Sequence, residues 1–155
     1  MNTTDDAFMD RAFTLARMAL DAGDTPYGAV LVGRDGAVVA EDRNATVSAR
    51  DLTAHAELAA VRNAGRAVGT AALAGSTMYA SGEPCPMCST AMALAGVTRV
   101  VFGISAAAAA ALAGPPDAGI VLGCREVLTH SRRPVTVEGP IRDDAAAALF
   151  GGSGD

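Results

Sequence analysis

The sequence contains no lysine and no tryptophan, and aromatic residues make up only 4% of it. All 12 basic residues are therefore arginine, and 17 acidic residues outnumber them, which gives a formal net charge of -5. A protein that lies along a nucleic-acid backbone needs clustered positive charge to release counterions, and unpaired bases stack on aromatic side chains. The composition therefore disfavours a long nucleic acid as a partner.

The chain also lacks a hydrophobic run of the roughly 18 residues needed to span a bilayer. The longest candidate, residues 104–120, is rich in alanine and is interrupted by Gly114-Pro115-Pro116-Asp117. The first ten residues carry three aspartates and no basic, apolar leader, so we expect no signal peptide and no membrane role. We expect a cytoplasmic protein, in which the three cysteines are reduced and serve metal or redox chemistry.

Half of the 155 residues are apolar and 19% are charged, which is typical of a soluble globular domain. We expect one domain over residues 1–155, with residues 151–155 as a flexible tail. Helical spacing of apolar residues predicts helices at 5–22, 53–64 (stopped by Gly65), 84–95, 106–113 (capped by Ser105) and 141–150. Short apolar runs predict strands at 28–32, 37–40, 77–80, 99–102 and 134–137.

The order of these elements indicates the fold class. A turn at residues 33–36 joins the first two strands as a hairpin. A helix between two strands usually forms a crossover between parallel partners, so the last strand should run parallel to the fourth. The expected fold is α/β, a three-layer α/β/α domain around a five-stranded mixed sheet.

Three residues form a candidate metal site. His55 lies near the start of the second predicted helix, and Cys85 and Cys88 open the third directly after a strand. Cysteines three apart at a helix start share a face, and the helix dipole there favours thiolates, the form that binds metal. One imidazole and two thiolates suit a tetrahedral Zn²⁺ ion whose fourth position stays open for water.

Glu57 is the candidate catalytic residue. Zinc with two thiolates and a neutral imidazole has no net charge, so water at this site needs a neighbouring base, and the Glu57 carboxylate can carry a proton from water to the substrate. Residues i and i+2 do not share a face of a regular helix. We therefore expect His55 in the first turn of the helix, with the longer Glu57 side chain reaching over the metal.

These residues carry a family resemblance. His55-Ala56-Glu57 and Pro84-Cys85-Pro86-Met87-Cys88 match the H-x-E and P-C-x-x-C signature of zinc nucleobase deaminases. The chain resembles the cytidine/deoxycytidylate deaminase superfamily, within it the branch of bacterial guanine deaminases, cytosine deaminases and tRNA adenosine deaminases. The resemblance implies a cytidine deaminase-like fold, one zinc ion per chain with a bound water or hydroxide, and hydrolytic deamination with Glu57 as both acid and base.

The resemblance also suggests residues that bind the substrate. Asn44 matches an asparagine that hydrogen-bonds the substrate, the backbone near Ala56 and residues 81–83 would hold the intermediate, and Asp117 lies where guanine deaminases keep a purine-reading acid. It further implies a homodimer, in which the segment around Phe150 closes over the pocket or is exchanged between subunits. Phe150 could equally anchor the last helix in the core.

Simpler interpretations stand beside these. The cysteine pair could be a thioredoxin-like redox motif, or the zinc site could be structural, with Cys124 or His130 as fourth ligand. Cys124 is otherwise expected to be buried in the core and His130 to lie at the surface. Asn44 and Asp117 could each serve a turn.

Two substrate classes compete. A free nucleobase, nucleoside or related heterocycle of the guanine, cytosine or triazine type fits the acidic composition, whereas a tRNA adenosine deaminase would need a basic surface and stacking groups. We expect the small heterocycle and regard nucleic acid as the alternative. A zinc-stabilised domain without catalysis is the third hypothesis.

Overall fold

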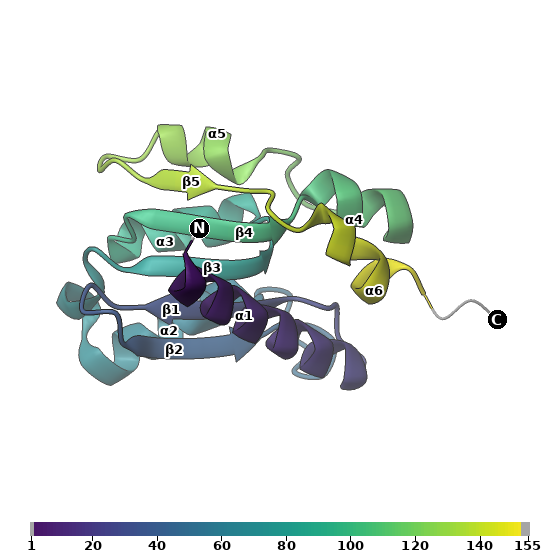
Figure 1. Ribbon diagram of the computed structural model, residues 1–155, viewed down its shortest axis with the longest axis horizontal. Helices are drawn as coiled ribbons and strands as arrows, with labels where there is room; N and C mark the ends of the chain where they lie inside the picture. Colours follow the sequence, from purple (N-terminus) through teal and green to yellow (C-terminus); the bar gives the residue numbers. More distant parts are fainter. Residues whose placement is uncertain (1, 153–155) are drawn as a thin grey trace.

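The computed structural model describes residues 2–152 (Figure 1). Along the chain the elements are α1 (Thr3–Asp21), β1 (Gly28–Val32), β2 (Val38–Arg43), α2 (Ala56–Val68), the 3₁₀ turn η1 (Thr70–Leu73), β3 (Thr77–Gly82), α3 (Pro86–Ala95), β4 (Arg99–Ile104), α4 (Ala106–Ala113), α5 (Cys124–Thr129), β5 (Thr136–Glu138), the 3₁₀ turn η2 (Asp143–Ala145) and α6 (Ala146–Phe150).

The five strands form one sheet in the order β2-β1-β3-β4-β5. β1 is antiparallel to both β2 and β3, while β3 pairs parallel with β4 and β4 with β5. The predicted mixed sheet, the hairpin of its first two strands and the parallel fifth strand are therefore confirmed. Because β3 and β4 are parallel, their carboxyl ends lie at the same edge of the sheet, which is where Cys85 follows.

Helices cover both faces of the sheet (Figure 1). Side chains alternate between the faces along each strand. Val30, Tyr79 and Val101 therefore pack on one face against α1, while Leu31, Met78 and Val100 pack on the other face with residues of α2 and α3. The expected three layers follow from this alternation.

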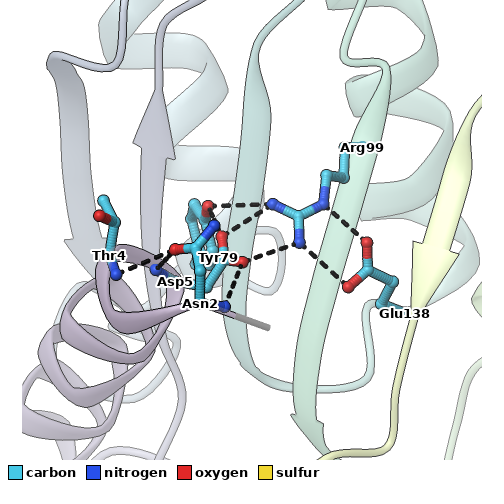
Figure 2. Close-up of polar contacts among 6 residues, drawn as sticks. All are labelled: Asn2, Thr4, Asp5, Tyr79, Arg99 and Glu138. Carbon is cyan, nitrogen blue, oxygen red and sulfur yellow. Dashed lines mark hydrogen bonds and ion pairs between the residues drawn. The ribbon is translucent and has the colours of Figure 1, made fainter.

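A network of polar side chains fastens α1 to the sheet (Figure 2). Asp5, in the first turn of α1, is only 4% exposed and accepts two hydrogen bonds from the Arg99 guanidinium, at 2.8 and 3.1 Å. The Tyr79 hydroxyl donates to the same carboxylate. Arg99 also binds both carboxylate oxygens of Glu138, at 2.7 and 3.0 Å. The network thus joins α1, β3, β4 and β5.

The groups of this network shift one another's pKa values. The hydrogen bonds from Arg99, followed by the one from Tyr79, place the pKa of Asp5 well below its usual range even though burial opposes this. Burial and the hydrogen bond to Asp5 raise the pKa of Tyr79 to about 12. Asp5 therefore stays ionised and Tyr79 protonated over the physiological pH range.

The second predicted helix is misplaced at both ends. α2 begins at Ala56 and not at Thr53, with His55 as its N-cap in an extended conformation. The helix also continues through Gly65 to Val68, and it ends at Gly69, whose φ of 81° suits glycine. Gly65 does not stop the helix because the good helix formers Arg66 and Ala67 follow it.

The C-terminal third differs most from the prediction. Ser105 caps α4 as expected, its hydroxyl accepting from the Ala108 N–H at 3.1 Å. The short helix α5 was not predicted, and residues 141–150 form a 3₁₀ turn followed by the short α6 in place of one helix. Gly151 caps α6 through a bond to the Ala147 carbonyl, and residues 153–155 of the predicted tail lie outside the described residues.

Within residues 2–152, no helix combines the length and the apolar character that a bilayer span requires.

Candidate metal centre

Two of the three candidate ligands lie directly before helices, and Cys88 lies in the first turn of the second of these helices. His55 is the N-cap of α2, with φ -76° and ψ 149°, and Cys85 is the N-cap of α3, with φ -71° and ψ 170°. Because His55 is extended, the facing rule for a regular helix does not apply between it and Glu57. His55 thus lies before the first turn of α2 and not within it, which corrects our expectation and removes the geometric conflict.

The three ligand atoms converge. Nδ1 of His55 lies 3.5 Å from Sγ of Cys85 and 3.6 Å from Sγ of Cys88, and the three atoms lie within 4.8 Å of one another. A tetrahedral zinc ion with Zn–N near 2.0–2.1 Å and Zn–S near 2.3 Å places nitrogen and sulfur about 3.6 Å apart. The spacing therefore fits zinc. Among residues 2–152, no fourth histidine, cysteine or carboxylate joins this cluster.

The pKa values of the two candidate thiol ligands are shifted in opposite directions. A hydrogen bond from Cys88, and then one from His55, lower the pKa of Cys85 to about 4. The same Cys88–Cys85 hydrogen bond, together with burial and the charge of Glu57, raises the pKa of Cys88. A divalent cation bound between the two sulfurs would stabilise both of them as thiolates.

Glu57, the second residue of α2, lies against this cluster with 4% of its surface exposed. Burial raises its pKa to about 6; the negative charge of Cys85 adds to the shift, and the hydrogen bond from Cys88 opposes it. A buried carboxylate next to three candidate zinc ligands can exchange a proton with water held there.

Asn44 follows β2 and is 4% exposed. Its Oδ1 accepts from both the N–H and the hydroxyl of Thr46, at 3.1 and 2.9 Å, so it serves a turn, as the simpler interpretation held. No bond from its Nδ2 is found to any residue in the described part of the chain. That donor stays available to a substrate.

The other substrate-binding candidates differ in placement. Ala56 is buried at the first position of α2, between His55 and Glu57. Asp117 is exposed in the connection between α4 and α5, and the structure does not bring it into the ligand cluster. Its substrate role therefore stays a prediction.

Cys124 and His130 lie where we expected. Cys124 is fully buried at the start of α5, and His130 is exposed just after the end of that helix. Neither belongs to the ligand cluster. The geometry thus gives no support to a structural site that uses one of them as fourth ligand.

Our reasoning from sequence gave no role to the side chain of Tyr27. A Cβ on Gly82 would lie 2.4 Å from Cε1 of Tyr27, so glycine is needed there for the ring to lie against the end of β3. Burial, with the charges of Glu57 and Cys85, raises the pKa of Tyr27 to about 12. The signal that the sequence offered is that Tyr27, one of two tyrosines, lies directly before β1.

Phe150 packs on Tyr27, with ring centroids 5.4 Å apart. It is 8% exposed and contacts core residues of α1, β4 and α4, which makes it an anchor for α6.

The comparisons with known proteins agree with this geometry. The sequence profile of the "Cytidine and deoxycytidylate deaminase zinc-binding region" matches residues 2–104. Over 112 residues, 72% of this chain and 21% of the relative, the sequence is 45% identical to a tRNA(Ile)-lysidine synthase of Deinococcus deserti. It is also 45% identical to the guanine deaminase of Bacillus subtilis over 84 residues, 54% of this chain and 53% of that enzyme.

The chain therefore spans about a fifth of the lysidine synthase it matches and about half of the guanine deaminase. A solved structure from "Biochemical and Structural Studies of A-to-I Editing by tRNA:A34 Deaminases at the Wobble Position of Transfer RNA" superposes with a TM-score of 0.75 and 32% identity. The match covers 93% of this chain and 99% of that one.

Proposed function

The chain belongs to the cytidine and deoxycytidylate deaminase zinc-binding family, and from that premise we propose that it is a zinc-dependent hydrolytic deaminase. It would replace an exocyclic amine on a heterocycle with oxygen from water and release ammonia. The observation that carries this proposal is the convergence of His55, Cys85 and Cys88 at zinc-ligand spacing beside the buried carboxylate of Glu57.

A zinc ion held by these ligands supplies a Lewis acid that activates water at neutral pH. Glu57 accepts the proton of the attacking water on its carboxylate and returns it to the ring nitrogen next to the carbon under attack. A second proton transfer through Glu57 lets the amine leave as ammonia. The net reaction consumes one water and leaves the carboxylate as it began.

Asn44 and Ala56 would hold the substrate. The Asn44 Oδ1 is already occupied by Thr46, which orients the amide and leaves Nδ2 as a donor toward a ring acceptor. Ala56 offers the N–H of the first helical residue, and the first N–H groups of a helix have no partner within it. Asp117 would need the connection between α4 and α5 to place it nearer the metal.

We favour a small heterocycle of the guanine, cytosine or triazine type as substrate. Support comes from the acidic composition, the absence of lysine and the scarcity of aromatic residues. Similarity to the Bacillus subtilis guanine deaminase points the same way.

A tRNA adenosine deaminase is the second candidate, and two observations favour it. The superposed structure named for tRNA:A34 deaminases is matched over almost its whole length. A surface pocket of about 360 Å³ between α3 and the segment after α5 is lined by His130, Arg132 and Arg133, a place where phosphates of an RNA could bind.

The deciding experiment is an ammonia-release screen of the purified, zinc-loaded protein. The panel holds guanine, adenine, cytosine, isoguanine, 5-azacytosine, aminotriazines, the matching nucleosides and a tRNA anticodon stem-loop. We expect turnover of at least one free heterocycle. Activity only on the stem-loop would replace the favoured substrate by the second candidate, and zinc binding without turnover of any of them would leave a non-catalytic zinc domain.

A homodimer and a cytoplasmic location belong to the same proposal. The dimer rests on the family resemblance alone, because exposed apolar side chains such as Leu52 and Leu94, 91% and 84% exposed, are common on monomers. Light scattering behind size exclusion measures the mass directly, and a monomer at micromolar concentration would refute the dimer.

A further inference from the structure

Glu83 lies between the end of β3 and the zinc-ligand loop, a name we use for residues 84–88, which include Cys85 and Cys88. It follows Gly82 and precedes Pro84-Cys85. Its backbone N–H donates to the Ile104 carbonyl at 2.8 Å, which continues the pairing of β3 with β4 by one residue. The sheet therefore fixes the backbone of Glu83, and the half-buried side chain extends from a rigid position.

The Glu83 carboxylate joins the starts of two helices. Oε2 accepts from the N–H of Ala106, the first residue of α4, at 3.0 Å, and Oε1 accepts from the N–H of Cys124, the first residue of α5, at 3.1 Å. Both donors lie in first helical turns, where N–H groups have no partner within the helix and the dipole favours an anion. A single side chain satisfies both.

The second contact depends on Gly123. This residue is the N-cap of α5 and has no side chain with which to cap the helix. A Cβ on Gly123 would lie 3.1 Å from Oε1 of Glu83, tighter than most real contacts. Glycine at this position thus leaves room for the Glu83 carboxylate, and the carboxylate caps the helix.

Between these two points the chain is held mainly by the packing of α4 against α6. Residues 111–123 are all exposed, and Ala109 is the only buried residue of α4. Outside Glu83, the start of α4 is bound by Asp143, which accepts from the N–H and hydroxyl of Ser105 at 2.7 and 3.1 Å. The far end, at Cys124, has no second side-chain cap among the described residues.

Both ends of this exposed segment are bonded to a residue that lies next to the metal ligands in the chain. Glu83 is two residues from Cys85, and α3, which carries Cys88, packs against α5. Figure 1 shows α4 beyond the carboxyl end of β4, the edge of the sheet at which the ligands gather.

We propose that Glu83 is a positioning residue, whose carboxylate ties both ends of residues 106–123 to the zinc-ligand loop so that this segment forms a wall of the substrate pocket. The inference rests on the proposed deaminase function. Glu83 touches neither the zinc ligands nor a reacting atom through its side chain, so it acts on substrate affinity and not on zinc binding or proton transfer.

The test compares Glu83→Ala, Glu83→Gln and the wild type by hydrogen exchange and by steady-state kinetics on the heterocycle found in the screen. In Glu83→Ala, amide exchange should rise in residues 105–110 and 124–128 and stay unchanged in β1 and β3. We expect KM to rise by about tenfold, kcat to change by less than about threefold, and the zinc content to stay at one per chain. The exchange rates and the KM of Glu83→Gln should lie between those of the wild type and those of Glu83→Ala, because an amide can accept only through its one oxygen.

Asp143→Ala is the matched control, because it frees the start of α4 alone. Exchange should then rise near Ser105 but not near Cys124, with KM within about twofold of the wild type. An unchanged exchange rate at both helix starts in Glu83→Ala, an unchanged KM despite faster exchange, or loss of zinc would each overturn the assignment. Failure of the deaminase proposal is recognised separately, as absence of turnover in the wild type, and the exchange measurement then still decides whether Glu83 anchors the segment.

Discussion

Two clusters of ionisable groups lie at different places along the parallel strands. In the first, Asp5 and Glu138 form ion pairs with Arg99, the first residue of β4, and the Tyr79 hydroxyl donates to Asp5. At the carboxyl end, His55, Cys85, Cys88 and Glu57 are brought together without an arginine among them. The first cluster contains its own cation, whereas the second gathers acidic groups and an imidazole.

The difference separates a structural cluster from a chemical one. Like charges brought together in a buried place are costly unless something compensates them. In the network of Figure 2 the guanidinium compensates two carboxylates, and the cluster holds α1 in place. In the metal centre the cation that the chain offers is the imidazole of His55, whose pKa is raised by its hydrogen bond to Cys85, and a divalent cation would add the charge needed to hold both sulfurs as thiolates.

Loss of a zinc ligand should have the largest effect. Cys88→Ser replaces a thiolate by a hydroxyl that does not ionise at neutral pH, so we expect the zinc content to fall to under about a tenth of the wild-type value and turnover to vanish. Atomic absorption and ammonia release measure the two. Cys124→Ser is the control, because this buried cysteine lies outside the cluster and its replacement should keep the zinc. Equal zinc in both variants would disprove the ligand assignment.

Glu57→Gln should have the second-largest effect. The amide fills the same space but cannot take a proton, so kcat should fall by roughly 10²–10⁴-fold while zinc stays at one per chain. Zinc analysis and single-turnover kinetics on the same preparation make the comparison. Turnover near the wild-type rate would remove Glu57 from the mechanism, and loss of zinc would show that it supports the ligands.

Arg99→Ala tests the other cluster. The substitution leaves the buried Asp5 carboxylate without its cation, so we expect the free energy of unfolding to drop by about 2–3 kcal/mol, with zinc content unchanged. Urea denaturation measures it. Arg11→Ala removes an ion pair with Glu41 at the surface, where the side chains are 42% and 34% exposed, and should cost less than about 1 kcal/mol. Equal losses in both variants would mean that the buried network adds nothing.

The loss of stability in Arg99→Ala should depend on pH, which is a smaller effect than the loss itself. The pKa of Asp5 is lowered in the folded protein, so its contribution is fully present above its unfolded pKa of about 4 and is lost as the pH falls toward the folded value. The gap in unfolding free energy between the wild type and Arg99→Ala should therefore shrink from pH 6 to pH 3. Measuring both in a Cys88→Ser background removes the pH dependence of zinc binding. A gap that widens in acid would contradict the pairing.

Sequence reasoning reached the residues of the metal centre but not their backbone. The spacing of His55, Glu57, Cys85 and Cys88 was sufficient to propose a site, because each group lies at the start of an element. His55 was nevertheless placed within the helix, since helix starts depend on the turn of chain before them. α5 was missed although Cys124, Val127 and Leu128 have helical spacing, because six residues are too few for a periodic signal.

The amino-acid sequence by itself determined the candidate zinc ligands, because ligand types and local spacing are local properties. It also determined the mixed sheet, the hairpin of its first two strands and the parallel fifth strand, because these follow from the order of the elements. Only the tertiary structure decided that Asp5 meets Arg99 across 94 positions and that Glu83 meets both Ala106 and Cys124. Such partnerships depend on the register of parallel strands and on how the helices pack, and these are set by the whole core together and by no segment alone.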